Sequence, residues 1–182
     1  SESQIRAWRD SIKILKNTVA ELKQDCPEIL SNGSIILEYT IPLESRRVDA
    51  ILLLNGVVIS IEFKGKSHPL QADIDQAAAY ARDLQAYHKE CAKTTVKCLL
   101  ILSQGFNETQ TKGGVEIIGS EAFSRYCINF MDKKKMPVDL QAFLSFESYQ
   151  PLPSLIKAAR ELFNSGTLTR IHRAATATEP TL

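Results

Sequence analysis

The stretch from Glu38 to Lys64, EYTIPLESRRVDAILLLNGVVISIEFK, carries most of the structural information in this chain. It belongs to a run of residues rich in Ile, Leu and Val that extends from Ser34 to Phe63 and predicts three β-strands. The run is divided first at Pro42–Ser45 and then at Asn55-Gly56. Asn-Gly between apolar runs is the strongest short hairpin signal, because both residues tolerate the positive φ of a type I′ turn. We therefore expect three adjacent strands joined by two tight turns.

The two turns determine which residues of neighbouring strands lie opposite each other. If the Asn-Gly pair is a two-residue loop, opposed residues have numbers that sum to 111, so Asp49 lies opposite Glu62 and Arg47 opposite Lys64. A four-residue turn at the earlier division gives a sum of 87, which places Glu38 on the other side of Asp49. The three acids then form one row on one face of the sheet. A slip of one residue in the earlier turn would instead move Glu38 to the opposite face.

Such a row of like charges needs compensation. Opposed side chains have Cβ atoms about 4.5–5.5 Å apart, and like charges at that distance are destabilising. A divalent cation compensates for them, since Mg²⁺ prefers one or two carboxylates together with waters and phosphate oxygens. Arg47 and Lys64 repel each other one pleat along, and a phosphate between them would relieve that repulsion. The pattern predicts a metal beside a phosphate.

A solvated sheet face is the plainer interpretation of the same charges, because polar and apolar residues normally alternate there. The face nevertheless carries apolar residues one or two pleats further on, namely Ile36, Ile51, Leu53 and Val58. These residues indicate that the face is covered. We therefore expect the charged row at the rim of a cleft, and the solvated face remains the alternative.

The rest of the chain alternates helical and strand patterns. Apolar residues at three- and four-residue steps predict an amphipathic helix that Pro27 ends, and they are Ile5, Trp8, Ile12, Leu15, Val19 and Leu22. Trp8 lies on this apolar face, which favours a core position. We expect further helices at Leu70–Cys91, Ser120–Met131, Val138–Phe146 and Ser154–Asn164, strands at Val96–Leu102 and Val115–Ile118, and turns in Ser103–Gly114. This order predicts an α/β fold with a central mixed β-sheet flanked by helices.

Length and charge exclude several classes of protein. The chain has 182 residues, 44% of them hydrophobic, with 22 Lys+Arg against 21 Asp+Glu and a net charge of +1. We expect one domain over residues 1–173 and a linker or tail rich in Ala, Thr and Pro over residues 174–182. The charge balance excludes a generally basic nucleic-acid-binding surface, so any attraction for nucleic acid must be local.

Nothing in the sequence indicates a membrane protein or a disulfide-bonded scaffold. The longest run without a charged residue, Ala50–Ile61, is too short to span a bilayer, and Ser1–Asp10 has no apolar signal core. Four widely spaced cysteines are typical of buried free thiols, and they are Cys26, Cys91, Cys98 and Cys127. We expect a cytoplasmic protein with no membrane partner.

The order of Asp49, a hairpin and then Glu62-Phe63-Lys64 resembles the PD-(D/E)xK nuclease signature, in which an Asp on one strand and an acid-x-Lys on the next form the active site. Val48 stands where that signature has Pro. The spacing Gln76-x-x-x-Tyr80 is similar to a motif of the RecB-like branch, and i and i+4 side chains can face the same cleft. The resemblance implies a restriction-endonuclease-like core. The layout also resembles nuclease modules that precede a helicase domain in larger bacterial proteins.

The resemblance implies a metal site built from acids. Asp49 and Glu62, with the carbonyl of Phe63, would hold Mg²⁺ or Mn²⁺, and Glu38 would bind it directly or through water. An acid from the first helix often joins the site in this family, which makes Glu21 a rival to Glu38. The register favours Glu38.

The other matching residues would act on the water and the phosphate. Lys64 would orient the metal-activated water or neutralise the developing charge. Gln76 would hold Lys64 or the nucleophile in place, whereas Arg47 and Tyr80 would hold the flanking phosphate.

The function implied is a metal-dependent nuclease that hydrolyses DNA as part of a bacterial DNA-processing or phage-defence protein, with a fused or associated helicase. The alternative is a catalytically silent nuclease-like domain that serves in nucleic-acid binding or protein assembly.

Overall fold

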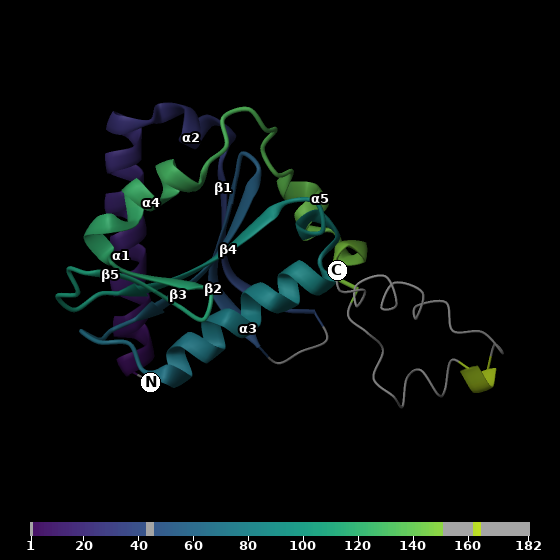
Figure 1. Cartoon of the computed structure of the whole chain (residues 1–182), viewed down its shortest axis with the longest axis horizontal. Coiled ribbons are helices and arrows are strands. Elements are labelled where there is room, and N and C mark those ends of the chain that lie inside the picture. The colour runs from purple at the N-terminus through teal and green to yellow at the C-terminus, as the bar shows by residue number, and fades with distance from the viewer. Residues whose placement is uncertain (1, 43–45, 151–161, 165–182) are drawn as a thin grey trace.

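The structure is a computed structural model that describes residues 2–42, 46–150 and 162–164 (Figure 1). Three expectations fall wholly or partly outside these residues: the turn at Pro42–Ser45, the helix at Ser154–Asn164 and the tail at 174–182. Of that helix, residues 162–164 are described and are helical.

A six-stranded mixed sheet forms the centre of the fold, in the order β1-β2-β3-β4-β6-β5. Its strands are β1 (Ser34–Thr40), β2 (Arg47–Leu54), β3 (Val57–Lys64), β4 (Thr95–Leu102), β5 (Thr109–Lys112) and β6 (Val115–Gly119). β1, β2 and β3 pair antiparallel, whereas β3, β4 and β6 are parallel. β5 returns antiparallel to β6. The expected α/β class with a central mixed sheet is confirmed, and the arrangement is consistent with a restriction-endonuclease-like core.

Helices cover both faces of the sheet (Figure 1). α1 (Glu2–Asp25), α2 (Pro27–Asn32) and α4 (Phe123–Phe130) pack on one face, and α3 (Gln71–Tyr87) and α5 (Leu140–Leu144) pack on the other. Short 3₁₀ turns lie at Lys89–Cys91, Ser120–Ala122 and Phe146–Ser148. The apolar face predicted from Ile51, Leu53 and Val58 is covered by Tyr80 and Leu84 of α3.

The two strand registers agree with the sequence arithmetic. β2 and β3 pair Leu54 with Val57 and continue to Ala50 with Ile61, each a sum of 111. β1 and β2 pair Leu37 with Ala50 and Tyr39 with Val48, each a sum of 87. The acids predicted to share a row therefore lie at neighbouring positions of three adjacent strands.

The turn between β2 and β3 differs from the type I′ expectation. Gly56 has a φ of +70°, whereas Glu38 is the one non-glycine residue with positive φ in the described part of the chain, so Asn55 does not adopt the left-handed conformation. The segment that follows α4 explains the difference. The carbonyl of Asn55 accepts a hydrogen bond from Asp132 N at 3.0 Å, and Gly56 N donates to the carbonyl of Met136 at 3.1 Å.

Some element boundaries were wrong. Ser103–Gly114 was expected to be turns but contains β5, whose four residues are all exposed and polar. The helix expected at Ser120–Met131 begins as a 3₁₀ turn, and the one at Val138–Phe146 is reduced to Leu140–Leu144.

The four cysteines are buried free thiols, as expected. Among the described residues, no helix combines the length and the apolar character that a bilayer span requires.

Candidate active site

The β2–β3 ladder stops where the predicted acids begin. Its last pair is Ala50 with Ile61, although β2 starts at Arg47 and β3 continues to Lys64. Beyond this pair β2 remains paired with β1, and β3 remains paired with β4 as far as Lys64. The carboxylate of Asp49 substitutes for the missing ladder, since its Oδ2 accepts a hydrogen bond from Phe63 N at 2.9 Å.

A cavity of about 660 Å³ lies at this break in the ladder. Its lining includes six of the predicted site residues, namely Glu38, Arg47, Asp49, Glu62, Phe63 and Lys64. The first half of α1 forms the opposite wall. The charged row therefore borders a cavity, as expected, and the solvated-face interpretation is wrong.

Glu62 is the most buried of the acids that line the cavity, with 3% of its surface exposed. Its Oε1 accepts a hydrogen bond from Lys64 Nζ at 2.8 Å, whereas its Oε2 is buried and has no partner among the described residues. Burial, together with the nearby charge of Asp49, raises the pKa of Glu62 to about 7. An unsatisfied buried oxygen is costly, so this atom is available to a ligand that the protein alone does not supply.

Asp49 adds a second carboxylate beside Glu62. Burial raises its pKa, and the charge of Glu38 acts in the same direction, against the hydrogen bond from Phe63 and the charge of Lys64. The pKa of both acids is thus raised, that of Glu62 in part by the charge of Asp49, and a bound cation would favour the ionised form of each.

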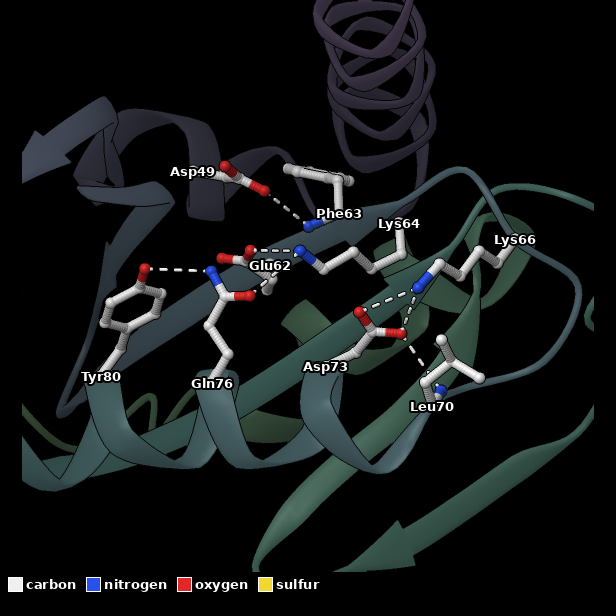
Figure 2. A network of polar contacts seen from close by, with 9 residues as sticks. All are labelled: Asp49, Glu62, Phe63, Lys64, Lys66, Leu70, Asp73, Gln76 and Tyr80. Carbon is white, nitrogen blue, oxygen red and sulfur yellow. Dashed lines mark hydrogen bonds and ion pairs between the residues drawn. The ribbon is translucent and has the colours of Figure 1, made fainter. Parts of the chain in front are cut away.

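Lys64 connects the acids to α3 (Figure 2). It also donates to Gln76 Oε1 at 3.3 Å, and Gln76 Nε2 donates to the hydroxyl oxygen of Tyr80 at 3.0 Å. Burial alone would lower the pKa of Lys64, but the hydrogen bond to Glu62 and the charges of Glu62 and Asp49 outweigh burial and raise it. Gln76 and Tyr80 therefore reach Lys64 through a chain of hydrogen bonds. Neither lines the cavity, and Tyr80 is only 4% exposed, so the expectation that both face the cleft was wrong.

Glu38 and Arg47 form a separate pair at the mouth of the cavity. Arg47 Nε lies 2.6 Å from Glu38 Oε2. The register predicted that Arg47 lies opposite Lys64, but its side chain pairs with Glu38 instead. Glu38 has a φ of +54° and interrupts the β1–β2 ladder opposite Asp49. Backbone strain of this kind costs about 1–3 kcal/mol and is concentrated at functional sites. Glu21, the rival acid, is exposed and does not line the cavity.

Asp73 and Lys66, which the sequence analysis did not identify, support the site. Asp73 is buried at the start of α3, where it accepts hydrogen bonds from Lys66 Nζ at 2.8 and 3.0 Å and from Leu70 N at 3.1 Å (Figure 2). Burial would raise its pKa, but these hydrogen bonds and the charge of Lys66 lower it. An acid at the third position of a helix is a capping signal, and this signal could have identified Asp73 from the sequence.

Trp8 was expected in the core, and that expectation was wrong. Its side chain lines the cavity and is 53% exposed. The buried residues of the same stripe, Leu15 and Leu22, lie further along α1.

No family model, curated protein or solved structure matches this chain. The resemblance to the PD-(D/E)xK signature therefore depends on the motif residues themselves, and the chemistry must be argued from their geometry.

The donor set fits a hard divalent cation in part. Asp49 and Glu62 offer two carboxylates, and one buried oxygen of Glu62 has no partner among the residues described. Mg²⁺ commonly takes one or two carboxylates and completes its shell with waters and substrate phosphates. Over the described residues, no three His, Cys, Asp or Glu side chains are grouped as a ready metal site. The salt bridge from Arg47 is consistent with this finding, because it occupies the carboxylate of Glu38.

Proposed function

We propose that this domain is a metal-dependent nuclease that hydrolyses DNA phosphodiester bonds. The observation that carries the proposal is the buried oxygen of Glu62 that has no partner among the described residues, in a side chain that lines the cavity with Asp49 and Lys64. Burying two acids next to each other is destabilising unless a cation joins them. A fold that leaves this arrangement at an open cavity is suited to a cation and a charged substrate.

Asp49 and Glu62 would hold Mg²⁺ or Mn²⁺, together with the carbonyl of Phe63, and Glu38 would bind it directly or through water. When bound, such a metal lowers the pKa of a coordinated water and stabilises charge on the attacked phosphate.

The remaining residues would position the reacting groups. Lys64 bridges Glu62 and Gln76 and so has a fixed place at the edge of the cavity, from which its ammonium orients a water or neutralises developing charge. Tyr80 restrains Gln76 from the next turn of α3. Arg47 is the proposed contact to the flanking phosphate, whereas Tyr80 is 4% exposed and acts through Gln76.

The proposed partners follow from the proposed substrate. DNA processing or phage defence in the bacterial cytoplasm, with a fused or associated helicase, is the setting that the motif resemblance suggests.

A second candidate is a silent nuclease-like domain that serves in nucleic-acid binding or protein assembly. One observation favours it: Glu38 and Glu62 are already paired with Arg47 and Lys64, which partly neutralises the acids without any metal.

Cleavage assays distinguish the two candidates. Plasmid and linear DNA are incubated with Mg²⁺ or Mn²⁺ and wild-type protein, Glu62→Ala or Lys64→Ala. The matched controls are Glu28→Ala and Lys133→Ala, which remove an exposed ion pair of 2.6 Å outside the cavity. We expect cleavage by the wild type and both controls and its loss in the two site variants. Equal cleavage by all five proteins would sink the assignment.

A further inference from the structure

The apolar stripe of α1 changes its surroundings along the helix. Leu15 and Leu22 are buried against the sheet, whereas Ile5 and Trp8, earlier on the same stripe, are each 53% exposed. Both line the cavity. Half of an indole ring left in water forgoes a large part of the stabilisation that burial would give it. The start of α1 therefore presents exposed apolar side chains to the cavity that the acids also line.

The two sides of the cavity differ in chemistry. The α1 side presents the indole ring of Trp8 next to the aliphatic Ile5 and the guanidinium of Arg9. The sheet side presents Asp49 and Lys64. In Figure 2 the α1 ribbon lies beyond Asp49 and Phe63, on the side away from α3. One side thus suits a flat aromatic group, and the other suits a phosphate held by cations.

A nucleotide in single-stranded DNA also has an aromatic base on one side and a phosphate on the other. Its base is unstacked and so can contact a protein side chain. Aromatic side chains bind such bases by stacking, and the interaction is tolerant of sequence because every base has a π-face. In a duplex the bases are paired and stacked inside, so an indole on a cavity wall cannot reach them without strand separation.

We infer that Trp8 binds a nucleobase by stacking and thereby makes single-stranded DNA, including frayed ends, the preferred substrate of this site. The inference rests on the proposed nuclease function for the identity of the ligand. Arg9, one residue further, contributes a positive charge on the same wall. With a net charge of +1, the chain has no large excess of cations to bind DNA phosphates. Stacking on Trp8 would therefore supply a larger share of the affinity.

The sequence supplies its own reporter for this contact. Trp8 is the sole tryptophan, so the intrinsic tryptophan fluorescence of the protein comes from the cavity wall alone. We would titrate the protein in EDTA with a 5′-unlabelled oligodeoxythymidine, the matching duplex and an oligouridine. The titration is repeated with Mn²⁺ on Lys64→Ala, a variant in which cleavage is expected to be lost. Single-stranded DNA should quench the fluorescence, and the duplex should not.

Two variants serve as controls on the same helix. The double variant Trp8→Phe/Val19→Trp moves the indole 11 positions along α1, about 16 Å at 1.5 Å per residue, and keeps it on the same face. Val19 is 47% exposed and lies outside the cavity. The quenching should disappear in this variant. By fluorescence anisotropy of a labelled oligodeoxythymidine, Trp8→Ala should weaken binding about 5- to 150-fold, the range for one stacked base, whereas Trp8→Phe should retain most of it and Val19→Ala all of it.

The outcomes separate the two proposals. Unchanged fluorescence with single-stranded DNA, or Trp8→Ala affinity equal to wild type, overturns the stacking inference even if the DNA is cleaved. Quenching by oligouridine at least as tight as by oligodeoxythymidine overturns the choice of DNA. Quenching without cleavage under any metal overturns the nuclease proposal and leaves single-strand binding in place.

Discussion

Glu62 and His88 are both titratable side chains that are almost fully buried, with 3% and 1% of their surfaces exposed, but they differ in their hydrogen-bond partners. Burial shifts each toward its neutral form, raising the pKa of Glu62 to about 7 and lowering that of His88 to about 4. His88 Nδ1 accepts a hydrogen bond from Glu90 N at 3.3 Å, so Nε2 carries the proton that bonds the Phe143 carbonyl at 3.0 Å. Its ring stacks on Phe143 with centroids 3.9 Å apart.

Both nitrogens of His88 are therefore satisfied, whereas one oxygen of Glu62, beside a second acid, has no partner in the part of the chain that the structure describes. A buried group with all its hydrogen bonds made serves the fold, and here it joins the end of α3 to α5. A buried group left unsatisfied at a cavity lowers stability, and groups of this kind are concentrated at functional sites. The difference lies in the partners of each group and not in the degree of burial.

Removing the satisfied group should have the largest effect on stability. His88→Ala leaves the Phe143 carbonyl without its donor and opens a cavity under a stacked ring. We expect a loss of about 3 kcal/mol in the free energy of unfolding. Urea unfolding followed by circular dichroism measures it, with the exposed Lys89→Ala as the control. A change below about 1 kcal/mol would contradict the structural role of His88.

Removing the unsatisfied charge should have the opposite sign. In EDTA at pH 8, Glu62→Gln should raise the free energy of unfolding by about 2 kcal/mol, because the variant has no charge to bury. The folded-state pKa of Glu62, about 7, exceeds its ordinary value of 4.5. Between these values the folded wild type binds a proton that the unfolded chain releases, so wild-type stability falls as the pH rises from about 4.5 to 7.

The advantage of Glu62→Gln should accordingly be small near pH 4.5 and complete above pH 7. Thermal melts across this range provide the test. A variant that is less stable than wild type at pH 8 would mean that the charge of Glu62 stabilises the fold.

The smallest expected effect is stabilisation by metal. Mn²⁺ at ten times its dissociation constant should stabilise the wild type by about 1.4 kcal/mol, because it binds the folded state alone. A thermal shift assay should show this rise and its absence in Asp49→Ala, with Glu28→Ala retaining it. An equal rise in all three proteins would place the metal elsewhere.

The sheet around the site could be predicted because local signals agreed with one another. The Asn55-Gly56 turn fixed one register and the length of the preceding turn fixed the other, so neighbouring positions for the three acids followed from arithmetic. β5 could not be predicted, because all four of its residues are polar and exposed and lack the alternation by which strands are identified.

The details of the site depended on long-range geometry. The register implied that Arg47 lies across from Lys64, but the ladder ends at Ala50 and Arg47 pairs with Glu38 instead. The exposure of Trp8 could not be predicted either, since helix periodicity predicts which residues share a face and not which of them the sheet covers. Sequence patterns thus predicted most site residues, and the break in the ladder determined how they are arranged.

The metal-binding role of Glu62 is tested most directly by two measurements on Glu62→Gln. The first is its rate of cleavage of labelled single-stranded and duplex DNA in Mn²⁺, and the second is its free energy of unfolding. Gln keeps the shape of Glu but lacks the charge that would hold the metal. We expect a protein that is more stable than wild type and cleaves at least about 100-fold more slowly, the trade-off that follows when a strained group is removed from an active site. Cleavage by Glu62→Gln at the wild-type rate, or none by the wild type with any divalent metal, would contradict this role.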